Sequence, residues 1–384
     1  MLAASLYSDR MAVLIGVDEA GYGPNYGPLC VAATAWRVEE QRAEGGRRKA
    51  EGGSRGSPAS CATKRAVASS PTVNGFPDLY KLLRKAVVRT PDKVGRKLAI
   101  ADSKALYKAG FGVHQLERGV LAALAATGAA VGEARCIERV AELLAATVAD
   151  PLELRRELRC HEDDGQTLPL EAEAKEICRL AAKLRQVCEE SGVALLAIRA
   201  RLVYPTEFNA LIERYGNKGA ALSHVTLGLV RQVVDEVAVA TRAGVGDGPA
   251  RSQLTPGSYF ICLDKHGGRN RYAALVQHHF PDGWIEAVSE NRNLSRYRWR
   301  HGDAAVEAIF RVGCEELLPT ALASMTAKYH REVAMRAFNA FWTARLPELR
   351  PTAGYPGDSH RFRADIAHVQ QELGIEDRVL WRCR

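Results

Sequence analysis

The chain has 384 residues, of which 47% are hydrophobic and 26% charged, a composition typical of a globular protein with one large domain or two. No apolar stretch is long enough to span a bilayer, and the first ten residues lack the apolar segment of a signal peptide. The net charge of +8 suits an anionic partner, although a basic balance alone raises the case for nucleic acid only modestly.

The nine cysteines follow no recognisable pattern. No CxxC pair is present, and no histidine spacing suits zinc. An odd, unpatterned set in a long chain indicates reduced thiols and a cytoplasmic location. Because Met11 directly precedes the first apolar run, we expect residues 1–10 to be a flexible tail and residues 11–384 to form the domain.

The first apolar run, residues 12–17, is rich in β-branched residues and predicts a buried strand. Two adjacent acids, Asp18 and Glu19, end the run, and a stretch rich in glycine and proline leads to a second predicted strand over residues 29–36. One interpretation of the acids is a solvated hairpin turn. The other is a site for a hard divalent cation, because two carboxylates at the end of a buried strand are costly without positive charge.

The next segments predict additions to a compact core. Residues 38–75 are of low complexity, with Gly, Ser, Arg and Lys, and predict a disordered insertion. Residues 77–92 predict a short helix. Helical spacing of Leu, Val and Ala over residues 113–147 and 168–190 predicts a helical insertion at about 113–190.

A second strand that ends in an acid follows later in the chain. Residues 193–203 predict a strand, and residues 208–239 predict two helices hinged near residues 216–219. Residues 258–264 then form an apolar run that ends in Asp264 and a glycine turn. If this strand lies parallel to the first one, or beside it, Asp264 comes next to Asp18 across 246 residues of sequence.

Four arginines lie around a predicted strand between the strands at residues 284–288 and 304–312. They interleave with aromatic residues in the order Arg292, Arg296, Tyr297, Arg298, Trp299, Arg300. Alternate residues of a strand share a face, so these arginines form either a phosphate-binding surface with aromatics for bases or sugars, or the wet face of an amphipathic strand. The sequence leaves both interpretations open.

The segment Val-Asp-Glu-Ala-Gly-x-Gly-x-x-x-Gly-Pro, beginning at Val17, resembles the first signature of ribonuclease HII (type 2 ribonuclease H). In that family the Asp-Glu pair binds catalytic metal, and the following Gly-Arg-Gly touches the ribonucleotide. The resemblance therefore implies metal binding by Asp18 and Glu19. It implies substrate contact at Gly21, Tyr22 and Gly23, with Tyr22 standing where the family has Arg.

Three later segments resemble further signatures of the family, in the same order. They are Asp102-Ser103-Lys104, the helix that runs from Ala323 through Ser324 and Lys328 to Glu332, and Gly354-Tyr355 with His360 five residues after Tyr355. The resemblance implies that Asp264 is the third metal ligand and that Tyr355 packs at the ribonucleotide. It implies that Ser103, Lys104, Ser324 and Lys328 bind the substrate, with Lys104 and Lys328 meeting phosphate or ordering the acids.

The fourth acid of the family departs from its usual place. In the family, a Gly-Asp ahead of the helix of Ser324 supplies it, but this chain has Cys314 there, followed by Glu315 and Glu316. A glutamate is longer than an aspartate and reaches further. We therefore expect Glu315 or Glu316 to take over the role.

The resemblance implies an α/β fold, with a ribonuclease H-like central mixed β-sheet flanked by helices and a helical C-terminal portion. It implies a metal-dependent endoribonuclease that uses two Mg²⁺ or Mn²⁺ ions to hydrolyse the RNA strand of RNA–DNA hybrids, or ribonucleotides embedded in duplex DNA. No membrane or protein partner is implied. The alternatives are a non-cleaving nucleic-acid-binding protein on this fold, and a DNA nuclease that shares the acids.

Overall fold

The computed structural model describes residues 12–39, 72–73, 76–92, 94–107, 112–129, 136–144, 160, 166–243 and 257–383. The predicted tail at residues 1–10 and nearly all of the predicted insertion at residues 38–75 lie outside these ranges. Within them, no helix has the length and apolar character that crossing a membrane requires.

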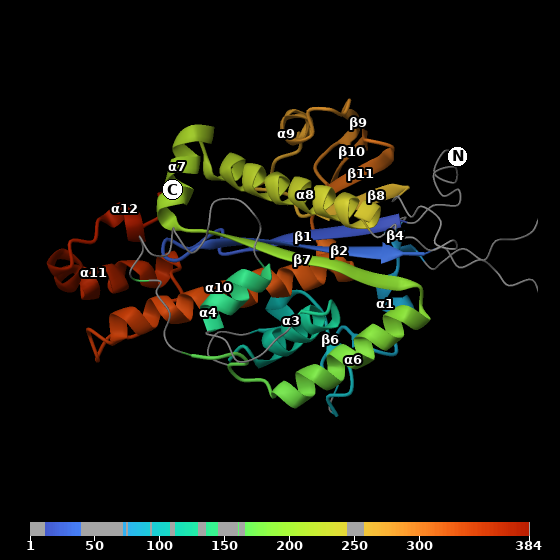
Figure 1. Cartoon of the computed structure of the whole chain (residues 1–384). Coiled ribbons are helices and arrows are strands. Elements are labelled where there is room, and N and C mark those ends of the chain that lie inside the picture. The colour runs from blue at the N-terminus through green and yellow to red at the C-terminus, as the bar shows by residue number, and fades with distance from the viewer. Residues whose placement is uncertain are drawn as a thin grey trace, which may run out of the picture.

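Within the described residues, seven strands form the central sheet (Figure 1). Their order across the sheet is β7 (Val193–Val203), β2 (Leu29–Val38), β1 (Ala12–Ala20), β8 (Ser258–Leu263), β11 (Ala304–Arg311), β10 (Leu294–His301) and β9 (Glu286–Glu290). Strand β1 runs antiparallel to β2 but parallel to β8, and β8 runs parallel to β11. The sheet is therefore mixed, and the expected fold class is confirmed.

Strand β1 lies inside the sheet, between β2 and β8, and is buried on both faces. Val13, Ile15 and Val17 belong to one hydrophobic cluster, whereas Ala12 and Leu14 belong to the other. Because successive side chains of a strand point to opposite faces, a strand covered on both sides needs a continuous apolar run rather than an alternating one.

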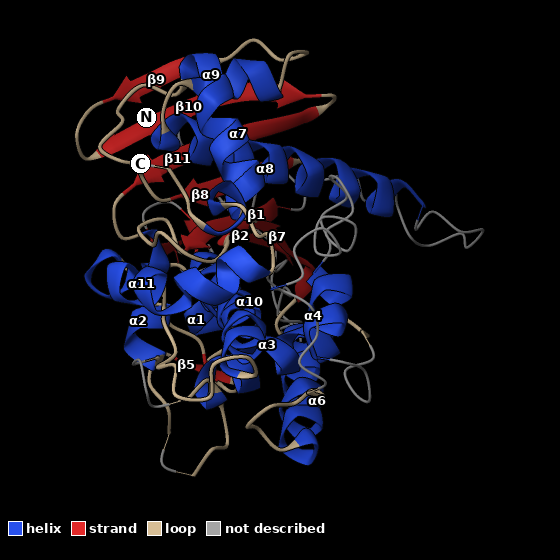
Figure 2. Ribbon diagram, turned by 90° about the vertical axis from the view of Figure 1, so that its left-hand side faces the viewer, coloured by secondary structure: helices blue, strands red, loops and turns tan. Residues whose placement is uncertain are grey.

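Helices cover both faces of this sheet (Figures 1 and 2). One layer contains α7 (Pro205–Tyr215), α8 (Lys218–Ala243) and α9 (Ala273–His279). The opposite layer contains α3 (His114–Ala126), α4 (Cys136–Leu144), α6 (Ala174–Glu190) and the long α10 (Leu318–Thr343). The C-terminal helices α11 (Pro356–Glu372) and α12 (Asp377–Leu380) follow α10, and α12 contacts α7.

Short elements complete the described chain. They are β3 (Thr72–Val73), β4 (Phe76–Pro77), α1 (Leu79–Leu82), β5 (Val87–Val88), β6 (Leu98–Ala99), α2 (Ser103–Leu106) and the 3₁₀ turn η2 (Cys314–Glu316). Two of them, α2 and η2, carry residues of the candidate site.

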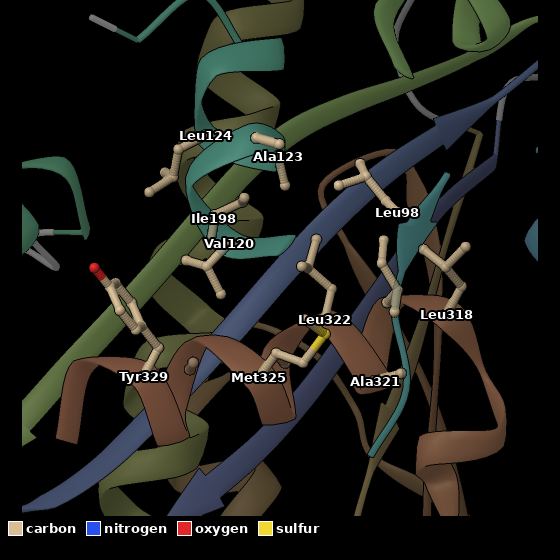
Figure 3. Packing of buried hydrophobic residues seen from close by; sticks show 14 of the residues in the cluster. Leu98, Val120, Ala123, Leu124, Ile198, Leu318, Ala321, Leu322, Met325 and Tyr329 are labelled. Atoms are coloured by element: carbon tan, nitrogen blue, oxygen red, sulfur yellow. The ribbon is translucent and has the colours of Figure 1, made fainter. Parts of the chain in front are cut away.

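The helices of the predicted 113–190 insertion pack into the main core. Val120 and Leu124 of α3 share one hydrophobic cluster with Leu322 and Met325 of α10 (Figure 3). One charged residue of α3, Glu117, is fully buried. Its carboxylate accepts hydrogen bonds from the Tyr329 hydroxyl and from three successive main-chain amides at residues 170–172, and these bonds offset the cost of burial.

A glycine sets the position of α10 against the sheet. A Cβ on Gly16 would lie only 2.1 Å from the main-chain nitrogen of Thr320, so no other residue fits in β1 at this point. The Thr34 hydroxyl donates to the carbonyl oxygen of Pro319 at 2.8 Å and fixes the same contact from β2. The first turns of α10 are thereby held beside the acid-bearing end of β1.

Candidate metal and nucleic-acid site

Three acids from distant parts of the sequence meet at one end of the sheet. Asp18 lies in β1, Asp264 directly follows β8, and Glu315 lies in η2; one carboxylate oxygen of each lies within 4.8 Å of the others. Strands β1 and β8 are adjacent and parallel, with Val17 paired to Leu263, so their acids emerge side by side. The expectation that Asp264 lies next to Asp18 is confirmed.

The acids repel one another. Burial raises the pKa of Asp18 well above its usual range, and the neighbouring Glu19 carboxylate raises it further. Burial and then Asp264 raise the pKa of Glu19 to about 7, while burial and then Glu315 raise that of Asp264 to about 6. Each charged carboxylate is therefore destabilised by lost solvation and by its neighbours.

Lys104 is the cation that faces these acids. The charges of Asp102, and more weakly of Glu315, Asp18 and Asp264, raise its pKa. Asp102 also caps α2, because its side chain accepts a hydrogen bond from the Lys104 main-chain amide at 3.0 Å. The fixed turn keeps Lys104 beside the acids.

Ser103 and Ser324 are both buried, and they join α2 to α10. The Ser103 main-chain amide donates to the Ser324 Oγ at 3.3 Å, and the two hydroxyls lie 3.1 Å apart. A hydrogen bond from Ser324 to Asp18 lowers the pKa of that acid, against the larger effect of burial. These two serines thus hold the helices against the acid of β1.

The two glutamates of η2 differ in their surroundings. Glu315 lies in the acid cluster, whereas Glu316 is exposed and pairs with Arg311 at 2.6 Å. The structure therefore brings Glu315, and not Glu316, to Asp18 and Asp264.

Cys314, at the position of the missing acid, forms a disulfide with Cys262 of β8. The expectation of reduced thiols is wrong for this pair: folding places two cysteines 52 residues apart with their Cα atoms at 6.3 Å, which sequence spacing does not reveal. The Cys314 main-chain amide donates to Asp264 Oδ1 at 3.1 Å. The segment that carries Glu315 is thus tied to the segment that carries Asp264.

The glycine turn after β1 lies on two buried arginines. Gly21 has φ of +84°, and a Cβ there would lie 2.3 Å from the Nε of Arg331, so both backbone conformation and space require glycine. Arg331 Nε donates to the Pro28 carbonyl at 3.2 Å, and Arg382 Nη2 donates to the Gly21 carbonyl at 2.7 Å. Neither arginine was predicted to lie beneath this turn. Arg331 belongs to the segment from Ala323 to Glu332 that resembles a family signature, whereas no sequence pattern indicates Arg382.

Tyr22, in the turn after β1, lies beside a lysine at the start of α8. The Lys218 Nζ at the start of α8 lies 4.9 Å from the centroid of the Tyr22 ring. A positive charge therefore stands next to Tyr22, supplied by a residue 196 positions away. No pattern in the sequence indicates this pairing.

Gly23 and Tyr355 also lie close together. A Cβ on Gly23 would be 3.9 Å from Cε1 of Tyr355, whose side chain is 47% exposed just before α11. Lys328 is engaged elsewhere: its Nζ pairs with Glu332 and lies 4.4 Å over the ring of Tyr107. The structure therefore brings Tyr355 to the glycine turn and places Lys328 in an ion pair along α10.

The arginine-bearing strand β10 is amphipathic. Tyr297 and Trp299 are buried in the core, so the interpretation in which they contact bases or sugars is wrong. Arg296 and Arg298 lie on the other face, and both pair with Glu307 of β11, at 3.6 and 2.7 Å. The other two arginines are exposed: Arg292 precedes the strand, and Arg300 donates to the carbonyl of Asp303.

The sequence matches no protein-family model and no curated protein. Among solved structures, ribonuclease H2 from Pyrococcus horikoshii OT3 aligns with 96% of this chain and 92% of its own, at 12% identity and a TM-score of 0.34. Ribonuclease HII from Archaeoglobus fulgidus, solved with PCNA, aligns with 97% of this chain and 94% of its own, at 12% identity and a TM-score of 0.35. Bst-RNase HIII, solved with Mn²⁺, aligns with 99% of this chain and 68% of its own, at 13% identity and a TM-score of 0.33. Likenesses of this size carry no argument about activity.

Proposed function

We propose that this protein is a metal-dependent endonuclease of the ribonuclease H type. The observation that carries the proposal is the meeting of Asp18, Asp264 and Glu315, three carboxylates from separate segments, in a place where burial and neighbouring acids destabilise the charges of Asp18 and Asp264. Binding of a cation offsets this destabilisation, so the arrangement indicates a cation site.

The donor set fits Mg²⁺ or Mn²⁺, which prefer oxygen ligands. Asp18, Glu19, Asp264 and Glu315 would hold the metal, because these are the acids whose charges act on one another. When bound, two such ions supply an activated water and stabilise the leaving oxygen of a phosphodiester.

The chain's own residues prepare this site. Lys104 offsets part of the negative charge, and the Cys314 amide leaves Asp264 Oδ1 fixed in one direction. Ser103 and Ser324 hold α2 and α10 at the correct distance from Asp18. Asp18 and Asp264 are thus oriented before a ligand arrives, which lowers the entropic cost of binding.

We infer the substrate from the family resemblance together with the glycine turn. Gly23 carries no Cβ, and the exposed Tyr355 ring lies 3.9 Å from the place a Cβ would take, so a sugar is able to approach the main chain there. At Gly21 the corresponding space is filled by Arg331. The proposed substrate is the RNA strand of an RNA–DNA hybrid, or a ribonucleotide embedded in duplex DNA.

The test is cleavage of end-labelled duplexes that contain zero, one or four ribonucleotides, each in Mg²⁺, Mn²⁺ or EDTA. We expect cutting next to ribonucleotides in either metal and none in EDTA. Equal cutting of the all-DNA duplex would refute ribose recognition and favour the DNA nuclease. Tight binding of the hybrid without cutting in either metal would favour the non-cleaving alternative.

A further inference from the structure

Three histidines gather on the helical layer that contains α8 and α9, away from the acids described above. His224 lies in α8, and His278 and His279 end α9. One ring nitrogen of each lies within 4.8 Å of the others, and the Nδ1 of His224 is 3.1 Å from the Nε2 of His279. Two imidazole nitrogens bound to one tetrahedral Zn²⁺ at about 2.0–2.1 Å stand about 3.3 Å apart, close to this separation.

Neighbouring side chains position two of these residues. The ring of Tyr215 stacks on that of His224, with centroids 3.7 Å apart and planes at 14°. Arg231 Nη1 donates to the main-chain carbonyl of His279 at 3.1 Å, which fixes the end of α9 against α8. A ligand that joins these rings therefore loses little conformational entropy on binding.

We propose that His224, His278 and His279 form a binding site for a late first-row transition metal ion such as Zn²⁺. This site stands independently of the proposed nuclease function, since it shares no residue with the acid cluster. The ion would connect α8 to α9. Because His278 is exposed, the remaining coordination position would be open to water.

The chemistry of the donors selects the class of metal. Imidazole suits Zn²⁺, Cu²⁺, Ni²⁺ and Co²⁺, whereas Mg²⁺ and Ca²⁺ require oxygen ligands. Three arginines add positive charge around these rings, namely Arg214, Arg231 and Arg269. Their charge opposes the binding of any cation, so the affinity of the site must come from its nitrogen donors, which suit the transition metals.

The surroundings of both inner rings favour the neutral form of the imidazole. Burial, and then the charges of His224 and His278, lower the pKa of His279 to about 4. Burial and then His278 lower the pKa of His224. A neutral imidazole presents a lone pair, which a metal needs.

The experiment uses the full chain, without a histidine tag and stripped with EDTA, titrated with Co²⁺ as a spectroscopic probe. We expect visible d–d bands that saturate at one equivalent, with no thiolate charge-transfer band, because the ligands are imidazoles. An Asp18→Asn, Asp264→Asn double variant should keep these bands, which separates this site from the acid cluster. Added Zn²⁺ should abolish them and raise the Tm.

His278→Ala is the main variant, because this exposed side chain is not needed for folding. It should weaken Zn²⁺ binding by more than about 100-fold, since loss of even an outer-shell partner commonly costs 10–100-fold. His224→Gln should do the same, with circular dichroism checking its fold. His368→Ala is the matched control, because His368 is an exposed histidine of α11 and its loss should change nothing.

Two results would overturn the proposal. One is the absence of Co²⁺ and Zn²⁺ binding by the stripped protein at micromolar concentrations, which would leave the three rings as a hydrogen-bonded stack. The other is binding that His278→Ala and His224→Gln do not weaken, which would place the metal elsewhere.

Discussion

The acid cluster and the arginine-bearing strand β10 both concentrate charge, but they differ in how that charge is balanced. In the acid cluster, Asp18, Asp264 and Glu315 face one another, and their charges exceed that of Lys104. In β10, Arg296 and Arg298 share the carboxylate of Glu307. Unbalanced buried charge indicates a ligand site, whereas partly neutralised charge on the exposed face of a strand is also what a stable sheet contains.

The two regions also differ in what they contribute to the stability of the fold. Like charges brought together from three segments oppose folding, and a bound cation or protonation of the acids reverses that effect. An ion pair between partly exposed side chains on neighbouring strands contributes at most about 1 kcal/mol. The predictions below test the comparison, beginning with the largest expected effect.

Asp18→Asn and Asp264→Asn should each lower the cleavage rate by at least about 1,000-fold, which corresponds to about 4 kcal/mol of activation free energy. Each change removes a ligand charge while keeping shape. In EDTA the same variants should have an unchanged or higher Tm, because repulsion among the acids falls. Asp282→Asn, at an 82% exposed position, is the control and should alter neither quantity. Near-wild-type turnover by either variant would exclude the proposed site.

The two glutamates of η2 can be compared directly, because Glu315 lies in the acid cluster whereas Glu316 forms a surface ion pair. Glu315→Gln should lower cleavage by more than about 100-fold, an effect of almost 3 kcal/mol. Glu316→Gln should leave cleavage within about threefold, because it removes only the surface pair with Arg311. A larger loss in Glu316→Gln than in Glu315→Gln would reverse the assignment of the fourth acid.

The metal-free protein should lose stability as pH rises from about 4.5 to 7.5. Glu19 and Asp264 have pKa values raised to about 7 and about 6, so over this range the folded state holds more protons than the unfolded state. Unfolding then releases protons and becomes easier at higher pH. Thermal scans in EDTA should show this decline. Asp264→Asn should flatten it, and saturating Mg²⁺ should remove most of it; an EDTA curve that rises over this range would contradict the raised pKa values.

The strands that carry the acids could be predicted from the sequence, because a buried strand requires a continuous apolar run and each of these runs ends in a carboxylate. The sequence also predicted the hinge between α7 and α8, where the chain has Gly216 and Gly219. The expected juxtaposition of Asp18 and Asp264 followed from two strands of the same design, and the structure confirms it.

The contacts that sequence could not supply are those between residues far apart in the chain. Lys218 beside Tyr22, Arg382 beneath Gly21, and the Cys262–Cys314 disulfide all depend on tertiary packing. The strand of arginines shows a different limit. An alternating pattern shows which side chains share a face, but it does not show that Glu307 of the next strand lies opposite them.

The smallest effects should come from β10, and they test whether its arginines bind nucleic acid in spite of their ion pairs. Each full phosphate contact contributes about 0.9 to the slope of log binding constant against log salt for B-form DNA. Arg292 is exposed, so Arg292→Ala should lower the slope by about that amount if the strand lies on the binding path. Arg296→Ala and Arg298→Ala should each lower it by less, because Glu307 already neutralises part of their charge.

Glu307→Gln makes this last comparison decisive. The substitution keeps the length of the side chain but removes the charge that Arg296 and Arg298 share, so both guanidinium groups become available to phosphate. Affinity for a hybrid duplex should rise severalfold at low salt, and the salt slope should become steeper. The fold should change little, because a partly exposed pair contributes so little to stability. If Glu307→Gln leaves both affinity and slope unchanged, β10 lies off the nucleic-acid path and its arginines only stabilise the sheet.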